Sequence, residues 1–260
     1  MTRLFETIEY DVSKLVATIR LNRPDKLNAF TPTMNAEITK AVTQASKADD
    51  VRAIVITGEG KAFSAGEDLA NVDDETDYAA FLRDRYNPMI EKIVSVEKPI
   101  VAAVNGVAAG AGLSLALACD FRLASERASL MNAFIHIGLI PDSGNLYFLS
   151  RLIGHAKTME MAVMGEKIKA HDAEKLGLVN RVVNEKDWEV EVAEFAETLA
   201  QKPTKTIGLI KRYLHENWHL SLSEMLEKEA YGQKIAGQTH DHQEGLKAFK
   251  EKRKPLFEGK

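Results

Sequence analysis

A glycine-rich segment in the middle of the chain has residue types that can stabilise negative charge. Gly106, Gly110 and Gly112 follow the apolar run 99–104, within the segment 105–119. Glycine allows a tight turn from strand to helix, and the first N–H groups of a helix have no partner inside it. Such N–H groups can bind a phosphate or a carbonyl oxygen that is gaining negative charge. The spacing matches neither common nucleotide-binding glycine motif, and tight packing alone would also explain it.

A second glycine-containing loop, residues 62–69, directly follows another apolar run, residues 51–57. In a layered α/β fold, loops at the same ends of neighbouring strands converge on one pocket. One backbone N–H group from each loop would form an oxyanion hole, the pair of donors that binds a carbonyl oxygen as it becomes negative. The two loops therefore predict a site for carbonyl chemistry.

One carboxylate lies in a turn where it could serve this chemistry. Asp142 stands in the sequence Leu-Ile-Pro-Asp-Ser-Gly, residues 139–144, before a predicted helix. A positioned carboxylate can remove a proton and return it, but Asp before a helix is also a common N-cap. From the residues alone both roles are open. His136 alternates with apolar residues and fits the surface of a strand.

The elements that would position these loops alternate between strand and helix. Residues 4–10 and 15–21 predict a hairpin, with Leu15 on the apolar face of its second strand. Thr31 and Pro32 predict the start of a helix. Its apolar stripe comprises Met34, Ile38, Ala41, Val42 and Ala45. Further strands are predicted at residues 51–57, 99–104, 121–124 and 129–132.

Helical patterns become more frequent toward the end of the chain. A helix over residues 78–94 is expected to break at Asn87-Pro88, and Asp172 is expected to cap a short helix. From residue 187 onward the pattern is helical almost throughout. We therefore predict an α/β core over residues 1–200 and a helical region over residues 201–260.

The composition excludes several classes of protein. The 260 residues are 45% hydrophobic and 28% charged, with a formal net charge of -4, so nothing in the overall charge favours nucleic-acid binding. The single cysteine, Cys119, excludes an intrachain disulfide and a cysteine-based metal site. No apolar targeting segment opens the sequence, and no apolar run reaches the ~18 residues of a membrane span. We therefore expect a cytoplasmic protein that is not held in a membrane.

Segments along nearly the whole chain resemble the enoyl-CoA hydratase/isomerase (crotonase) superfamily. They are residues 22–29, 62–69, 99–120, 138–141 and 177–180, in the family's order and spacing. The resemblance implies an α/β fold in which β-β-α turns form a spiral, followed by a C-terminal helical region. It also implies that residues 1–200 bind acyl-CoA. Residues 201–260 would join subunits into a homotrimer or hexamer.

The resemblance assigns roles to individual residues. The oxyanion donors fall on the backbone N–H groups of Ala65 and Ala111, which would hold a thioester enolate. Coenzyme A would arrive as part of the substrate, with no metal and no redox cofactor. The residues expected to line the binding site for the acyl-CoA are Lys26, Leu27, Ala29, Ser64, Gly66, Asp68, Leu69, Gly110, Ser114 and Phe134, with Phe249 and Lys252 reaching coenzyme A on a neighbouring subunit.

The acid–base positions depart from the hydratase pattern. The two hydratase glutamates fall on Ser114 and Phe134, neither of which can do that work. Asp142 instead matches the single catalytic aspartate of certain isomerases. Residues 105–112 and the tail 244–253 resemble the ring 1,2-epoxyphenylacetyl-CoA isomerase subgroup in particular.

The resemblance thus implies an acyl-CoA isomerase with one aspartate as proton shuttle. It would shift a double bond or rearrange a ring epoxide through the enolate. Two alternatives stay open. One is a 2-enoyl-CoA hydratase in which Asp142 alone handles water, and the other is a non-catalytic or RNA-binding protein with the same fold.

Overall fold

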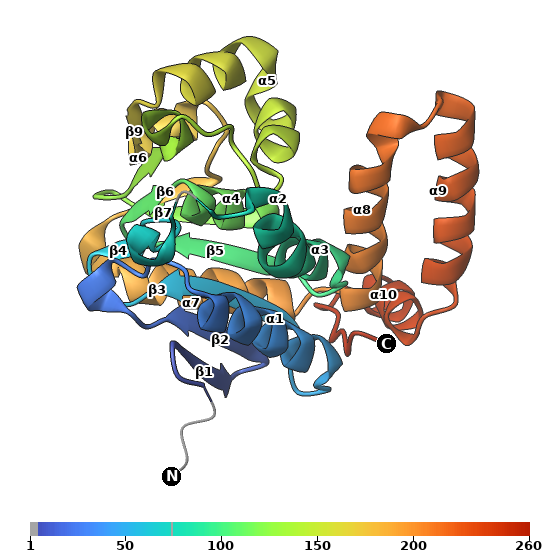
Figure 1. The fold of residues 1–260 in the computed structure, drawn as a ribbon. Helices are drawn as coiled ribbons and strands as arrows, with labels where there is room; N and C mark the ends of the chain where they lie inside the picture. The colour runs from blue at the N-terminus through green and yellow to red at the C-terminus, as the bar shows by residue number, and fades with distance from the viewer. Residues whose placement is uncertain (1–4, 74) are drawn as a thin grey trace.

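Two β-sheets form the framework of the protein in the computed structural model, which describes residues 5–73 and 75–260 (Figure 1). The larger sheet has the spatial order β1 (Ile8–Ser13), β2 (Val16–Leu21), β3 (Ala53–Gly58), β5 (Ile100–Val104), β7 (Phe121–Ser125), β10 (Arg181–Val183). The smaller sheet has the order β4 (Ala62–Ser64), β6 (Val107–Ala109), β8 (Ser129–Met131), β9 (Lys167–Lys169). Apart from the antiparallel pairs β1–β2 and β8–β9, neighbouring strands are parallel.

The chain repeats one unit, in which a strand of the larger sheet, a short strand of the smaller sheet and a helix follow one another. The helices after β4, β6 and β8 are α3 (Asn87–Ser95), α4 (Ala111–Ala118) and α5 (Asn145–Met164). The expected α/β spiral of β-β-α turns is therefore confirmed. Because β4, β6 and β8 are parallel neighbours, the loops that follow them leave the small sheet at the same edge.

Helix α1 (Pro32–Lys47) forms as its sequence predicts. The Thr31 hydroxyl accepts a hydrogen bond from the Met34 N–H at 3.2 Å, and Pro32 occupies the first turn. The predicted stripe is buried in the main core, where α1 packs on the first strands and on α3.

The first hairpin turns later than predicted. Strand β1 runs to Ser13, which pairs with Val16, so the loop consists of Lys14 and Leu15 alone. Both have positive φ, 49° and 67°, which suits the twist of a two-residue hairpin. Leu15 therefore lies exposed in the turn and not on the apolar face of the strand. Leu4, at the predicted start of the first strand, lies outside the described residues.

Three further local predictions need correction. The helix over 78–94 consists of α2 (Tyr78–Phe81), a π-helical turn Leu82–Tyr86 and α3, so the irregularity precedes Asn87. Asp172 does not cap its helix, because α6 (Ala170–Lys175) begins directly after β9 and places Asp172 in the first turn. His136 belongs to the 3₁₀ helix Ala133–Ile137 and not to a strand.

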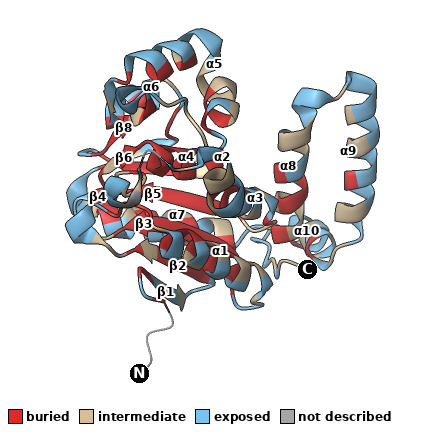
Figure 2. Cartoon of the chain, in the orientation of Figure 1, coloured by how far each residue is buried: buried red, intermediate tan, exposed pale blue. Residues whose placement is uncertain are grey.

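Helices dominate the last part of the chain. Helix α7 (Trp188–Ala200) packs on the outer face of the larger sheet and forms a second apolar cluster with it. Helices α8 (Thr204–Glu216) and α9 (Leu222–Gly237) stand as a pair beside the core, with α10 (His240–Glu251) at their base (Figure 1). Burial is concentrated in the sheets and is sparse on α9 (Figure 2). None of the helices in the described ranges has the length and apolar character needed to cross a membrane.

Arg52 and Lys211 attach this helical region to the core. The buried Arg52 side chain donates hydrogen bonds to the carbonyl oxygens of Lys202 at 2.6 Å and Phe257 at 2.5 Å. Lys211 of α8 forms an ion pair with Asp120, with 2.7 Å between Nζ and Oδ2. Both cationic side chains are buried. Their contacts hold the first part of the helical region against the core.

Candidate active site

The two glycine-containing loops and Asp142 meet in one cavity of about 250 Å³. The loop after β4 contributes Gly66 and Glu67, and the loop after β6 contributes Gly110 and Ala111. Asp142 comes from the segment after β8, together with the aromatic ring of Phe134. The parallel order β4-β6-β8 explains why these three segments are adjacent.

The N-terminus of α4 supplies one free donor to this cavity. Gly110 precedes the helix with φ 53° and ψ -125°, a conformation that disfavours residues with a side chain. Its N–H donates to the Met131 carbonyl at 3.1 Å, and the first backbone hydrogen bond of the helix runs from Ser114 to Gly110. Among residues 5–73 and 75–260 the Ala111 N–H has no acceptor, so it is available to a bound oxygen.

The second donor is not the residue that the sequence indicated. The Ala65 N–H already donates to the Leu27 carbonyl at 2.9 Å, which contradicts its expected role as a free donor. Gly66 and Asp68 are also occupied, by the Ser64 hydroxyl at 3.2 Å and the Phe30 carbonyl at 3.0 Å. Within the described part of the chain, the Glu67 N–H is the one backbone N–H of residues 65–68 that lacks an acceptor.

Gly66 is one of the points where the two loops touch. A Cβ atom on Gly66 would lie 2.9 Å from the Ala109 carbonyl oxygen and 3.4 Å from the Ala111 nitrogen. Its φ of +94° also disfavours any residue with a side chain. This contact holds the two loops together, and Glu67 and Ala111, whose N–H groups have no acceptor among the described residues, both line the cavity.

Asp142 is a half-buried carboxylate with few partners. Burial raises the pKa of its carboxyl group, and the Ser143 hydroxyl, which donates to Oδ1 at 2.8 Å, opposes that shift. The helix α5 starts at Asn145 with Gly144 as its N-cap and no side-chain capping bond. Asp142 is therefore not an N-cap.

The backbone of Asp142 is held from two sides. Its carbonyl oxygen accepts hydrogen bonds from the Ser114 hydroxyl at 3.0 Å and from the Asn145 N–H at 2.9 Å. The Asn145 amide in turn donates to the Ser114 hydroxyl at 3.2 Å and accepts from Asn132 at 3.0 Å. These contacts hold the backbone of Asp142, which lines the cavity.

Glu67 brings a second carboxylate that sequence reasoning missed. Arg85 Nη2 lies 3.1 Å from each of its carboxylate oxygens, and the Tyr86 hydroxyl donates to Oε2 at 2.5 Å. Burial raises the pKa of the Glu67 carboxyl group, while Tyr86 and then Arg85 oppose the shift. Burial, and next the nearby Glu67 charge, raises the pKa of Tyr86. No local sequence signal identifies this cluster, because Arg85 and Tyr86 approach from the π-helical turn eighteen and nineteen residues later.

The family model for enoyl-CoA hydratase/isomerase matches residues 11–260. The chain belongs to this family. A "Probable enoyl-CoA hydratase" of Rhodobacter capsulatus is 40% identical over 98% of this chain and 99% of its own. The 1,2-epoxyphenylacetyl-CoA isomerase of Escherichia coli is 37% identical over 99% of this chain and its full length. The crystal structure of an enoyl-CoA hydratase from Bacillus anthracis has a TM-score of 0.92 at 33% identity, over 98% of this chain and 100% of that one.

In this enoyl-CoA hydratase/isomerase family member, several expected binding residues hold the site without lining it. Ser64 is fully buried and donates to the Asn28 carbonyl at 2.8 Å. Asp68 pairs with Arg23 at 2.9 Å and caps the 3₁₀ helix Leu69–Asn71. Ser114 supports the Asp142 backbone, as described above. Leu69 and Phe134 do line the cavity.

The residues expected to contact coenzyme A lie outside this cavity. Lys26 and Leu27 are exposed on a 3₁₀ turn, and the carbonyl of the buried Ala29 accepts a hydrogen bond from Arg23. Phe249 is exposed on α10, and Lys252 ends that helix in a left-handed conformation. The single chain leaves the roles of these residues as predictions.

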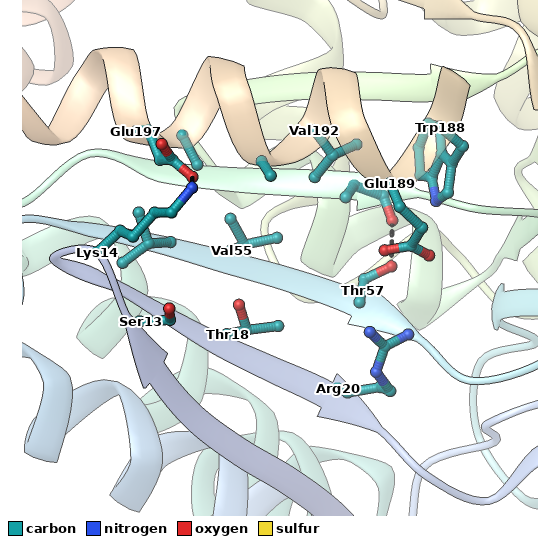
Figure 3. Close-up of a pocket in the computed structure, with 14 residues that line it drawn as sticks. Ser13, Lys14, Thr18, Arg20, Val55, Thr57, Trp188, Glu189, Val192 and Glu197 are labelled. Atoms are coloured by element: carbon teal, nitrogen blue, oxygen red, sulfur yellow. Dashed lines mark hydrogen bonds and ion pairs between the residues drawn. The ribbon is translucent and has the colours of Figure 1, made fainter. Parts of the chain in front are cut away.

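A separate cavity of about 310 Å³ lies beneath α7, on the far side of the larger sheet (Figure 3). Val55 and Val192 form part of its apolar walls, and the ion pair of Lys14 with Glu197 at 2.8 Å bounds one side. The Thr57 hydroxyl on its floor is occupied by the Ala103 carbonyl. The strands β2, β3 and β5 that line it pair with a neighbour on both sides. No cluster of three or more His, Cys, Asp or Glu that could hold a metal occurs among the described residues.

Proposed function

We propose that this enoyl-CoA hydratase/isomerase family member is an acyl-CoA isomerase with Asp142 as its proton shuttle. One observation carries the proposal: a carboxylate that caps no helix shares a cavity with the free N–H groups of Glu67 and Ala111. Glu67 is the other carboxylate in the cavity, and its oxygens are occupied by Arg85 and Tyr86. Asp142 is therefore the carboxylate that is free to exchange a proton.

The proposed reaction moves one proton within the acyl group. The thioester oxygen accepts hydrogen bonds from the Glu67 and Ala111 N–H groups, which makes the C2 protons more acidic. Asp142 takes a proton from C2 of a 3-enoyl thioester, the electrons spread to the thioester oxygen, and Asp142 returns the proton at C4. The double bond then lies between C2 and C3, and no water, metal or redox group is consumed. An acyl-CoA whose acyl group carries a ring epoxide is the related substrate that the resemblance implies.

The raised pKa of Asp142 suits this role. A carboxyl group whose pKa lies closer to neutral pH is a stronger base when ionised and still returns its proton readily. Burial against apolar walls such as Phe134 supplies the shift. The Ser143 hydrogen bond keeps the ionised form accessible.

We further propose that coenzyme A lies along Lys26, Leu27 and Ala29 and that residues 201–260 join subunits into a trimer or hexamer. Leu222 and Leu226 are apolar residues exposed on α9 of the single chain, which favours a partner surface there. In such an assembly Phe249 and Lys252 would reach the coenzyme A of a neighbouring subunit.

Hydration is the second candidate function. It is favoured by the relatives that carry the name hydratase. It is disfavoured by Ser114 and Phe134 at the positions of the two hydratase glutamates, because neither can activate water or deliver a proton.

The test compares wild type with Asp142→Asn on a 3-enoyl-CoA and a 2-enoyl-CoA of the same chain length. We expect wild type to isomerise the first and to hydrate the second weakly. The Asn variant should bind both thioesters and lose ~10²–10⁴-fold in isomerase kcat. An Asn variant with full activity would end the mechanism, and equal rates of hydration and isomerisation in wild type would favour the hydratase.

A further inference from the structure

The residue that supplies one oxyanion donor also carries a negative charge. Glu67 lines the cavity and its backbone N–H has no acceptor among the described residues, yet the side chain of the same residue ends in a carboxylate. A negative charge close to an oxygen that becomes negative would oppose the reaction, and it would do so strongly in a site that excludes water. The carboxylate must therefore be neutralised for the Glu67 N–H to be useful.

We propose that Arg85 neutralises and anchors the Glu67 carboxylate, so that the Glu67 N–H can stabilise an enolate. This makes Arg85 a positioning residue, since it acts through Glu67 and does not line the cavity. The inference rests on the proposed function, because it requires an enolate in this site.

The contacts of Arg85 suit this role. Its Nη2 group lies 3.1 Å from both Glu67 carboxylate oxygens and 3.1 Å from the Asn35 amide oxygen. The guanidinium carbon lies 3.9 Å from the centre of the Phe81 ring, which fixes the plane of the group. The side chains of Arg85 and Glu67 are only 16% and 18% exposed, so water screens their attraction little.

Tyr86 completes the anchor from the adjacent position. Its hydroxyl donates to the Glu67 Oε2 atom, and the Tyr86 ring packs edge-on against Phe30 at 5.7 Å between centroids. Arg85 and Tyr86 are consecutive residues of the π-helical turn Leu82–Tyr86, and both side chains contact the Glu67 carboxylate.

The experiment separates charge from packing with four variants. Arg85→Met removes the cation, and Arg83→Met removes a matched but exposed cation from the same turn. The double variant Arg85→Met with Glu67→Gln removes both charges and keeps the shape of the Glu67 side chain. Arg85→Lys is added in case Arg85→Met does not fold, because it keeps the charge with less favourable geometry.

Two readouts are measured. The first is isomerase kcat. The second is the fraction of bound acetoacetyl-CoA present as enolate, which is followed by its ultraviolet absorbance. In this ionisation C2 loses a proton to the buffer and the negative charge moves to the oxygens. The same measurement in an Asp142→Asn background tests the oxyanion site without the proposed shuttle.

We expect Arg85→Met to lower kcat and the enolate-to-keto ratio at least tenfold, with Arg83→Met close to wild type. The double variant should regain most of the loss, and Arg85→Lys should lie between wild type and Arg85→Met. A double variant no better than Arg85→Met, or an unchanged enolate ratio in Arg85→Met, would overturn the proposal. If wild type stabilises the enolate but isomerises no acyl-CoA, the proposed function fails while the role of Arg85 stands. If wild type does not stabilise the enolate, the role of Arg85 fails as well.

Discussion

Gly66→Ala is the substitution that most directly tests the contact between the two donor loops. The added methyl group would lie 2.9 Å from the Ala109 carbonyl oxygen, closer than carbon and oxygen atoms normally approach. The neighbour is a backbone atom and cannot rotate away as a side chain could. The loops after β4 and β6 must therefore separate to admit the methyl group.

Two effects contribute to the expected loss of stability and activity in Gly66→Ala. The positive φ of +94° alone costs about 1–2 kcal/mol for a residue with a side chain. Separating the loops adds to this cost and displaces the Glu67 and Ala111 N–H groups from a shared acceptor. Since a displacement of ~1 Å can reduce the rate ~10²-fold, we expect a loss of about that size in kcat.

Gly177→Ala is the matched control. Gly177 also has a positive φ, +78°, but a Cβ atom there would meet no described atom within 4 Å. Urea unfolding of both variants separates backbone strain from the clash, and isomerase assays with the acetoacetyl-CoA measurement report the donor geometry. If Gly66→Ala loses no more stability than Gly177→Ala and keeps wild-type kcat, the reasoning about the loop contact is wrong.

Three other predictions concern stability and assembly. Burial raises the folded-state pKa of Asp142, so the free energy of unfolding should fall as pH rises from the unfolded pKa of ~3.9 through the folded pKa. In urea unfolding, Asp142→Asn should therefore be more stable than wild type at neutral pH, and this advantage should disappear below pH ~3.9. A difference in the free energy of unfolding that stays constant with pH would contradict this explanation. Lys211→Met should lower the free energy of unfolding by ~3–5 kcal/mol, because Asp120 stays buried without its 2.7 Å ion pair, and adding Asp120→Asn should recover part of the loss. Light scattering should give three or six times the 28.8 kDa chain mass, and an active species of one chain mass would refute the trimer and the hexamer.

Local signals were sufficient where a structure depends on neighbours in the sequence. Thr31 and Pro32 predicted the start of α1, and the spacing of apolar residues predicted which face is buried. The glycine segment before Ala111 likewise predicted a strand, a turn and a helix with a free N–H group. At both helix starts the hydrogen bonds of the first turn, from the Met34 N–H to the Thr31 hydroxyl and from the Ser114 N–H to the Gly110 carbonyl, connect residues three or four positions apart.

Predictions were wrong where contacts between segments distant in the sequence determine the structure. The N–H group of Ala65 is used by Leu27, which is thirty-eight residues away, and the neighbouring Glu67 N–H remains free. Which N–H groups of the loop after β4 are used is determined only by its pairing with the segment that contains Leu27. The same is true of Arg85, which reaches Glu67 from a turn eighteen residues later in the sequence. The position of Leu15 was wrong for a similar reason, because the register of the hairpin determines whether Leu15 belongs to the strand or to the turn.

Arg52 has a mechanical consequence for the helical region. Its guanidinium group holds Lys202, just before α8, and Phe257, which follows α10. Helices α8, α9 and α10 therefore form a loop of chain whose two ends are fastened at one point of the core. Because both ends of the region are held, it cannot rotate as a unit about a single hinge. Motion relative to the core requires the helices to bend or the hydrogen bonds of Arg52 to break. The buried Arg52 side chain thus restricts the movement of a segment of more than fifty residues.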